Sequence, residues 1–147
     1  MFNAVISAEI AIDAPAQRVW TVLADLAGYA AWNPFTTHVE STLQDGAEVR
    51  MQVQMGPHWR LENRCTVSAV DPPHRLCWRN TLGAAWLQHS ERCQTLEVVA
   101  EGQVVYRTRE EFHGPLVPLT MLVARRAVLR GFRAVCQGVK AAVENVG

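Results

Sequence analysis

Near its start the chain reads IAIDAP (residues 10–15) and then AGYAAWNPF (residues 27–35). In the first stretch an alternating strand runs into Asp13, whose side chain can cap a helix, and Pro15, which suits a first helical turn. The second stretch ends its helical character before Pro34, because a proline pushes the preceding residue out of the helical region. We therefore expect one strand followed by two short helices.

The middle of the chain is a series of predicted strands separated by turn signals such as Asp45-Gly46. Apolar and polar residues alternate in these segments, which is typical of strands with one buried face and one wet face. With the strand at the start, we expect seven strands, over residues 6–12, 35–42, 49–55, 59–70, 75–82, 86–99 and 103–113.

From about Leu116 the period of the apolar residues changes from two to 3.6, which predicts a C-terminal helix of about 25–30 residues. Gly131 and Gly138 lower its intrinsic propensity. They either permit close approach to the sheet or leave space beside it. The order of elements predicts an α+β fold, a curved antiparallel seven-stranded sheet around this helix, as one domain over residues 1–147.

The composition excludes several classes of protein. Of the 147 residues 49% are apolar, which argues against disorder, and 14 basic side chains balance 14 acidic ones. Without a basic excess the chain lacks the electrostatic footprint of a protein that binds nucleic acid. No apolar run reaches the length of a membrane span and no secretory leader is visible, so we expect a cytoplasmic protein without integral membrane association.

The four cysteines, Cys65, Cys77, Cys93 and Cys136, are scattered along the chain without a C-x-x-C pair. We expect them to be reduced, buried thiols, as is usual in cytoplasmic proteins. The five histidines do not combine with them at the spacing of a zinc site. The sequence therefore predicts neither a metal nor another cofactor.

A series of different short motifs is spread along nearly the whole chain. They are residues 12–15, 19–20, Asp25, 32–34, 70–73, 76–78, His89 and 110–116. In this order they resemble the SRPBCC or START-like superfamily, and in particular its polyketide cyclase/dehydrase-like branch. The resemblance implies a helix-grip fold, in which the curved sheet clasps the C-terminal helix around an apolar cavity. It does not select an activity, because the superfamily includes carriers, cyclases, hydrolases and chaperone activators.

Strand alternation predicts which side chains face that cavity. On the strand over residues 103–113, Glu110 and Phe112 share the inner face. On the strand before it, His89, Glu91 and Cys93 share a face, which we place inside. A one-residue bulge would reverse this second assignment.

The functional interpretation is an apolar cavity that contains a few polar groups. His89, Glu91 and Glu110 are the predicted catalytic residues, because an apolar pocket raises the pKa of a carboxyl toward the range of acid–base chemistry and a histidine starts near it. The predicted ligand-binding residues have large apolar or amide side chains; they are Met51, Met55, Trp59, Asn63, Trp78, Asn80, Trp86, Tyr106, Phe112 and Phe132.

A purely structural interpretation competes for every one of these residues. An inward histidine is commonly a hydrogen-bonded core residue, and tryptophans and methionines usually pack the core of a small protein. Acids near basic strands form cross-strand ion pairs, with Arg64, Arg79, Arg92 or Arg109 as candidate partners.

Three functions therefore stay open. The first is binding of a small hydrophobic molecule (a lipid, an isoprenoid or a polyketide-like compound) between the sheet and the long helix. The second is a polyketide cyclase or dehydratase that uses His89 with Glu91 or Glu110 as acid and base. The third is a protein-interaction module with a filled core. The sequence also leaves a homodimer open.

Overall fold

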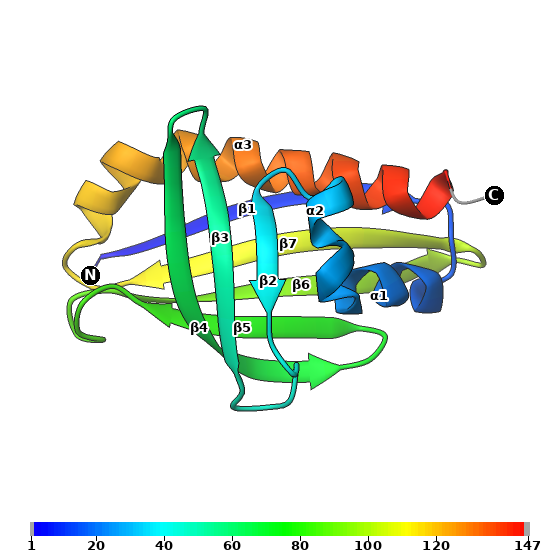
Figure 1. The fold of residues 1–147 in the computed structure, drawn as a ribbon, viewed down its shortest axis with the longest axis horizontal. Coiled ribbons are helices and arrows are strands. Elements are labelled where there is room, and N and C mark those ends of the chain that lie inside the picture. The colour runs from blue at the N-terminus through cyan, green and yellow to red at the C-terminus, as the bar shows by residue number, and fades with distance from the viewer. Residues whose placement is uncertain (1, 146–147) are drawn as a thin grey trace.

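A curved sheet and one long helix dominate the structure, a computed structural model that describes residues 2–145 (Figure 1). In chain order the elements are β1 (Asn3–Ile12), α1 (Ala16–Ala24), the 3-10 turn η1 (Leu26–Gly28), α2 (Tyr29–Trp32), β2 (Thr36–Glu40), β3 (Glu48–Gly56), β4 (Trp59–Asp71), β5 (Arg75–Thr81), β6 (His89–Ala100), β7 (Gln103–His113) and α3 (Val117–Glu144).

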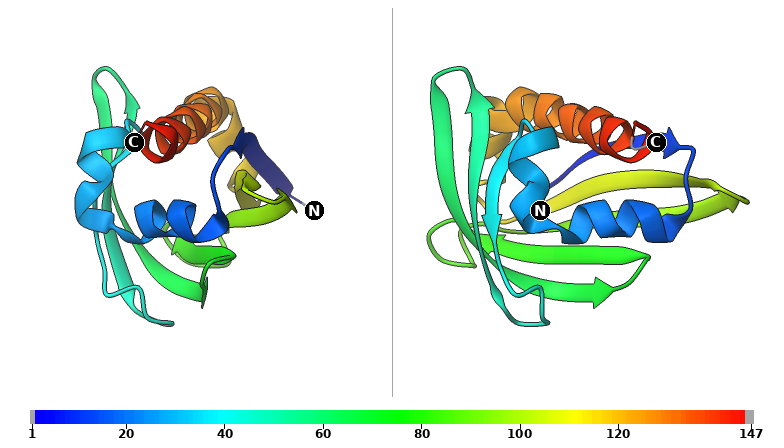
Figure 2. Two further views of the ribbon diagram at one scale, coloured as in Figure 1. Left: turned by 90° about the vertical axis from the view of Figure 1, so that its right-hand side faces the viewer. Right: turned by 45° about the vertical axis from the view of Figure 1, so that its right-hand side comes forward.

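The seven strands form one antiparallel sheet in the order β1-β7-β6-β5-β4-β3-β2. The sheet curls so that α3 lies across its concave side, as the end-on view in Figure 2 shows. The apolar stripe of α3 is buried there, with Phe132, Val135 and Val139 shielded from solvent. The predicted α+β helix-grip fold is therefore confirmed, including the two short N-terminal helices.

The start of α1 differs from the expectation. Pro15 occupies the N-cap position, so the prediction that Asp13 caps this helix is wrong. The Asp13 carboxylate instead accepts a hydrogen bond from Gln103 Nε2 at 3.0 Å. Its backbone N–H donates to Glu144 Oε2 at 2.9 Å. Asp13 thus ties the end of β1 to β7 and to the end of α3.

The two glycines of α3 allow the segment that contains Trp32 and Phe35 to pack directly against the helix backbone. A Cβ atom on Gly131 would lie 2.1 Å from Cδ1 of Phe35, and one on Gly138 would lie 2.2 Å from the backbone oxygen of Trp32. Both distances are far shorter than a van der Waals contact, so only glycine lets the segment from α2 to β2 lie this close to the helix. Phe35 reaches the interior beside Phe132 because of this contact.

β6 has the opposite orientation to the one predicted. His89, Glu91 and Cys93 face outward, whereas Ser90 and Arg92 are buried against the concave side. The reason is a bulge. Ala100 lies opposite Gln103, but Val98 lies opposite Val104, so β6 contains one extra residue next to the hairpin turn. Beyond that residue every side chain of the strand changes face.

The structure also corrects the expectation about the cysteines. Cys77 on β5 and Cys93 on β6 lie directly opposite each other and form a disulfide bond. Cys65 and Cys136 are free and buried. The prediction of four reduced thiols is wrong because it rested on the lack of a C-x-x-C pair, whereas cysteines on neighbouring strands meet without that spacing. The expectation of a cytoplasmic setting rested in part on those thiols and loses that support.

Along residues 2–145, no helix combines the length and the apolar character needed to cross a membrane.

Candidate functional site

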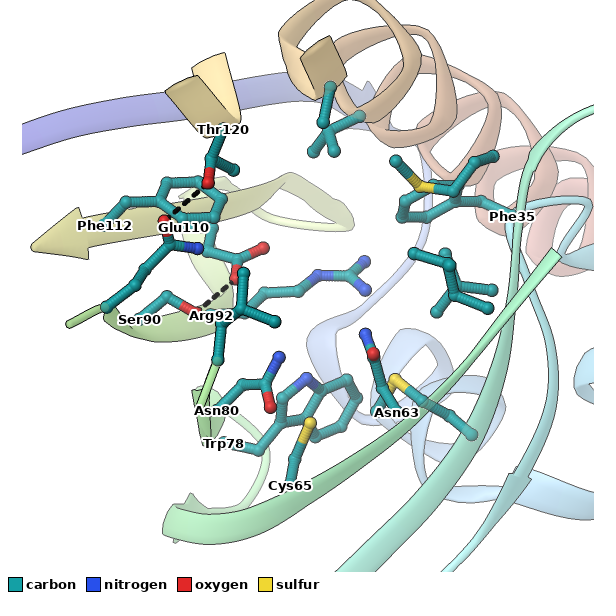
Figure 3. A pocket seen from close by; sticks show the side chains of 18 residues that line it. Phe35, Asn63, Cys65, Trp78, Asn80, Ser90, Arg92, Glu110, Phe112 and Thr120 are labelled. Atoms are coloured by element: carbon teal, nitrogen blue, oxygen red, sulfur yellow. Dashed lines mark hydrogen bonds between the residues drawn. The ribbon is translucent and has the colours of Figure 1, made fainter. Parts of the chain in front are cut away.

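A cavity of about 170 Å³ lies between the concave side of the sheet and the first half of α3 (Figure 3). Its wall is mostly apolar. The apolar lining residues come from β3–β5, β7, α3 and the loops beside the strands; they are Phe35, Met51, Val53, Met55, Leu61, Cys65, Trp78, Leu82, Phe112, Ala124 and Val128. The polar lining residues are Asn63, Asn80, Gln88, Ser90, Arg92, Glu110 and Thr120. This is the usual character of a small-molecule site, an apolar wall with a few convergent polar groups.

Glu110 on β7 is the acidic residue of the cavity. Its carboxylate accepts a hydrogen bond from Ser90 Oγ at 2.7 Å (Figure 3). Burial raises the pKa of Glu110, and the opposing effects of the Ser90 hydrogen bond and the nearby positive charge of Arg92 are smaller. Part of the residue keeps access to the cavity, while protein surrounds its carboxyl group. A carboxyl in this setting is suited to holding a proton against an apolar ligand.

Arg92 on β6 is the basic residue of the cavity, and it is only 5% exposed. Its Nε donates to Thr108 Oγ1 at 2.9 Å, and its Nη1 donates to Thr36 Oγ1 at 3.4 Å. The guanidinium carbon lies 4.7 Å from the ring centre of Phe132 and 5.7 Å from that of Trp78. Hydroxyl groups and aromatic faces therefore hold a charge that a core rarely accepts.

A second layer of polar contacts lies behind the cavity. The Tyr106 hydroxyl donates to Gln94 Oε1, and the Tyr29 hydroxyl donates to the backbone oxygen of Leu23 at 2.6 Å. Burial raises the pKa of Tyr29 to about 12 and that of Tyr106 further, so both phenols stay neutral. These contacts stabilise the wall and do not open onto the cavity.

The predicted ligand-binding residues and Glu110 divide into three groups. Those that line the cavity are Met51, Met55, Asn63, Trp78, Asn80, Glu110 and Phe112. Tyr106 and Phe132, both fully buried, pack in the core behind it. Trp59 and Trp86 do not line the cavity and are 36% and 75% exposed. The prediction that Trp86 belongs to a strand is wrong, since β6 begins only at His89.

His89 and Glu91 do not face the cavity, so the predicted inward placement of both is wrong. His89 Nδ1 lies 2.9 Å from the backbone oxygen of Ala85, and its ring stacks on that of His113. Glu91 accepts from Ser68 Oγ at 2.6 Å and pairs with Arg79 at 3.3 Å. For Glu91 the structural interpretation, a cross-strand ion pair, is the one observed. The extra residue in β6 accounts for both reversals.

Sequence reasoning missed Ser90 and Arg92, the two polar residues of β6 that do face the cavity. A signal was present in the strands on either side. Residues directly opposite each other in an antiparallel pair share a face. Arg92 lies opposite both Trp78 and Glu110, which were already assigned to the interior.

Within residues 2–145, no three side chains of the histidine, cysteine, aspartate or glutamate type gather closely enough to share a metal ion. The chemistry that this cavity offers on its own is that of a carboxyl, a guanidinium, amides and hydroxyls.

The sequence also matches a known family, described as polyketide cyclase / dehydrase and lipid transport, over residues 3–144. The chain belongs to this family. No curated protein matches it. The family description covers both catalysis and transport, so membership alone does not choose between an enzyme and a carrier.

Solved structures show how widely this family's fold is shared. The chain is similar to the Zhui aromatase/cyclase from Streptomyces sp. R1128, with 20% identity and a TM-score of 0.73 over 99% of this chain and 98% of the other. A truncated norcoclaurine synthase from Thalictrum flavum has 16% identity and a TM-score of 0.74 over 99% and 96%. A START superfamily protein from Mycobacterium smegmatis has 11% identity and a TM-score of 0.73 over 97% and 99%. At these identities the likeness is one of fold.

Proposed function

We propose that this protein binds a small, ring-containing hydrophobic molecule in the cavity between the sheet and α3. The observation that carries the proposal is the cavity itself, with its mostly apolar wall and its inward polar groups. An apolar cavity of about 150 Å³ holds a benzene molecule, whereas a drug-sized ligand needs about 300 Å³ or more. The volume of about 170 Å³ therefore favours a single ring over the long chain of a lipid.

The polar groups are placed to orient such a ring. Asn63 on β4 and Asn80 on β5 present amide groups to one side of the cavity, while Glu110 lies on the other (Figure 3). A ring with one or two oxygen substituents would gain hydrogen bonds here that a plain hydrocarbon lacks. The named activities of the structural neighbours, which include an aromatase/cyclase, agree with a ring-shaped ligand.

The experiment is a titration of indole and toluene, followed by NMR chemical shifts. We expect shifts at cavity residues in the wild-type protein. Ala124→Phe fills the cavity from α3 and should abolish them. Ala141→Phe adds the same volume at an exposed position of the same helix and should leave them unchanged. If Ala124→Phe and Ala141→Phe bind both rings as the wild type does, the cavity is not the site.

A second candidate is an enzyme of the cyclase or dehydratase kind, and the environment of Glu110 favours it. The raised pKa makes the Glu110 carboxylate a stronger base than a solvated glutamate. In a dehydration it would take the proton next to a ketone, the bond from carbon to the β-hydroxyl would break, and the same carboxyl would return the proton to form water. Since His89 and Glu91 face outward, Glu110 would act without them.

This candidate is tested with a β-hydroxyketone that carries a phenyl ring, because its enone product absorbs strongly in the ultraviolet. An enzyme should lose about a hundredfold or more of its rate in Glu110→Gln. Glu111→Gln, on the outer face of the same strand, should keep the rate. If the protein binds the ring compounds but does not convert the β-hydroxyketone, the enzyme candidate is wrong and ligand binding is the function.

A further inference from the structure

The guanidinium of Arg92 carries a donor group that nothing in the protein satisfies. Among residues 2–145, Nη2 of Arg92 is the one buried side-chain nitrogen or oxygen without a hydrogen-bond partner. The residue lines the cavity, and the guanidinium points into it in Figure 3. A buried, unmade hydrogen bond is costly, and it is more costly for a charged donor.

The positive charge of Arg92 also lacks an opposite charge at contact distance. None of the ion pairs within the described residues includes Arg92. Its two satisfied nitrogens donate to threonine hydroxyls, which are neutral. The rings of Phe132, Trp78 and Phe35 offset part of the charge through their electron-rich faces. The aromatic rings do not accept a hydrogen bond from Nη2, so this group stays without a partner.

Glu110 is the nearest candidate for an acid that neutralises Arg92, since the two residues lie opposite each other on β6 and β7. Its carboxyl group is hydrogen-bonded to Ser90 instead. Burial favours the protonated, neutral form of Glu110. With Glu110 neutral, the cavity carries a net positive charge.

We propose that the natural ligand is a small aromatic anion, of the class of the aromatic carboxylates, whose carboxylate accepts a hydrogen bond from Nη2 of Arg92. This inference rests on the proposed function, because it names the charge of the ligand held in the same cavity. The ring of the ligand lies against the apolar wall near Trp78 and Phe35. A protonated Glu110 is placed to donate a second hydrogen bond to the same carboxylate.

The test uses three probes of nearly the same shape and different charge. At pH 7 benzoate is an anion, benzamide is neutral and benzamidine is a cation. Their dissociation constants are measured on the wild-type protein by NMR titration, with toluene as an uncharged reference that reports on the cavity alone. We expect benzoate to bind about ten- to a hundredfold more tightly than benzamide, as for a hydrogen bond to a charged group, and benzamidine to bind most weakly.

Arg92→Met removes the charge and keeps a long apolar side chain among the aromatic rings. Replacing a buried charge by an apolar residue is commonly tolerated. In this variant we expect benzoate to lose its advantage over benzamide, with toluene binding retained. Arg92→Lys should keep part of the preference, because it keeps the charge. Arg126→Met, at an exposed position of α3, is the control and should behave as the wild type.

The outcomes separate this inference from the proposed function. Equal affinities for benzoate and benzamide, with toluene still bound, would show that solvent satisfies Nη2 and would overturn the inference alone. A preference for benzamidine would overturn it as well, because Glu110 would then set the charge of the site. If toluene and all three probes fail to bind, both the proposed function and this inference are wrong. The ranking of the probes on the wild-type protein decides between these outcomes even where an Arg92 variant does not fold.

Discussion

The two faces of β6 and β7 carry the same kinds of charged residue and treat them differently. On the outer face, Arg109 pairs with Glu111, and Glu91 pairs with Arg79, all with solvent access. On the inner face, Arg92 and Glu110 lie opposite each other and form no ion pair; each takes hydroxyl partners instead. Charges on the outer face are solvated and cheap to replace, whereas charges on the inner face are constrained by the core around them.

The comparison indicates that the charged residues of the inner face, and not those of the outer face, are the candidates for contact with a ligand. An outer ion pair at such exposure contributes about 0–1 kcal/mol and has no need of a ligand. An inner charge without a full set of partners lowers the stability of the folded protein. A bound molecule of opposite charge supplies the missing partner and restores that stability. The following changes test how far the two faces differ.

The largest difference should appear between an aromatic ring removed from the interior that the inner face covers and one removed from the exposed surface. Phe132 is fully buried against Arg92, so Phe132→Ala should cost about 3–5 kcal/mol of unfolding free energy. Trp86 is 75% exposed, and Trp86→Ala should change stability by about 0.5 kcal/mol or less. Urea unfolding followed by circular dichroism measures both. Similar losses for the two variants would contradict the division between a constrained interior and a tolerant surface.

A smaller effect should appear in the pH dependence of benzoate affinity. Among the described residues that line the cavity, those that titrate are Cys65, Arg92 and Glu110. Burial raises the pKa of Cys65 to about 12, so the thiol stays neutral, and arginine stays charged. Only Glu110 changes charge, and its carboxylate would repel the ligand. Affinity should therefore fall, by about tenfold, as pH rises through the raised pKa of Glu110.

The matched variant for this titration is Glu110→Gln, in which the affinity for benzoate should stay constant over the same range. A wild-type affinity that rises with pH would contradict the assignment of Glu110 as the neighbour of the bound carboxylate.

Glu110 should also affect stability in the absence of a ligand. Its pKa is raised in the folded state, so the unfolded chain loses the proton first as pH rises. Stability is therefore highest below the unfolded pKa and falls as pH rises toward the folded pKa. Glu110→Gln removes this loss and keeps an acceptor for Ser90. Its midpoint in urea should exceed that of the wild type by more at pH 8 than at pH 4. A constant difference would place the carboxyl in solvent.

The smallest effects should come from the outer face. Glu91→Gln removes the pair with Arg79 and should cost less than about 1 kcal/mol. His89→Ala should be equally mild, because the ring is exposed. Neither change should alter the binding of toluene or benzoate. A loss of binding in either variant would make both residues candidates again for direct action on the ligand.

The fold was predictable from sequence because its signals are local and repeated. The turn at Asp45-Gly46, the alternation in β3 and the change of period at the start of α3 each predict an element on their own. The inner face of β6 was not predictable in this way. Its orientation depends on an extra residue near Val98, which no alternation pattern reveals. A buried arginine also contradicts the usual rule for charged residues, so nothing in its residue type corrects the alternation that places Arg92 on the outer face.

The extra residue in β6 has a consequence for how relatives should be aligned. Deleting Val99 would remove the bulge and keep the rest of the pairing, so Arg92 would still lie opposite Glu110. A relative whose β6–β7 hairpin lacks the extra residue should therefore be aligned with a gap at Val99. A gap placed before β6 instead would displace the whole strand by one position and would match the inner position of Arg92 with an outward-facing residue of the relative.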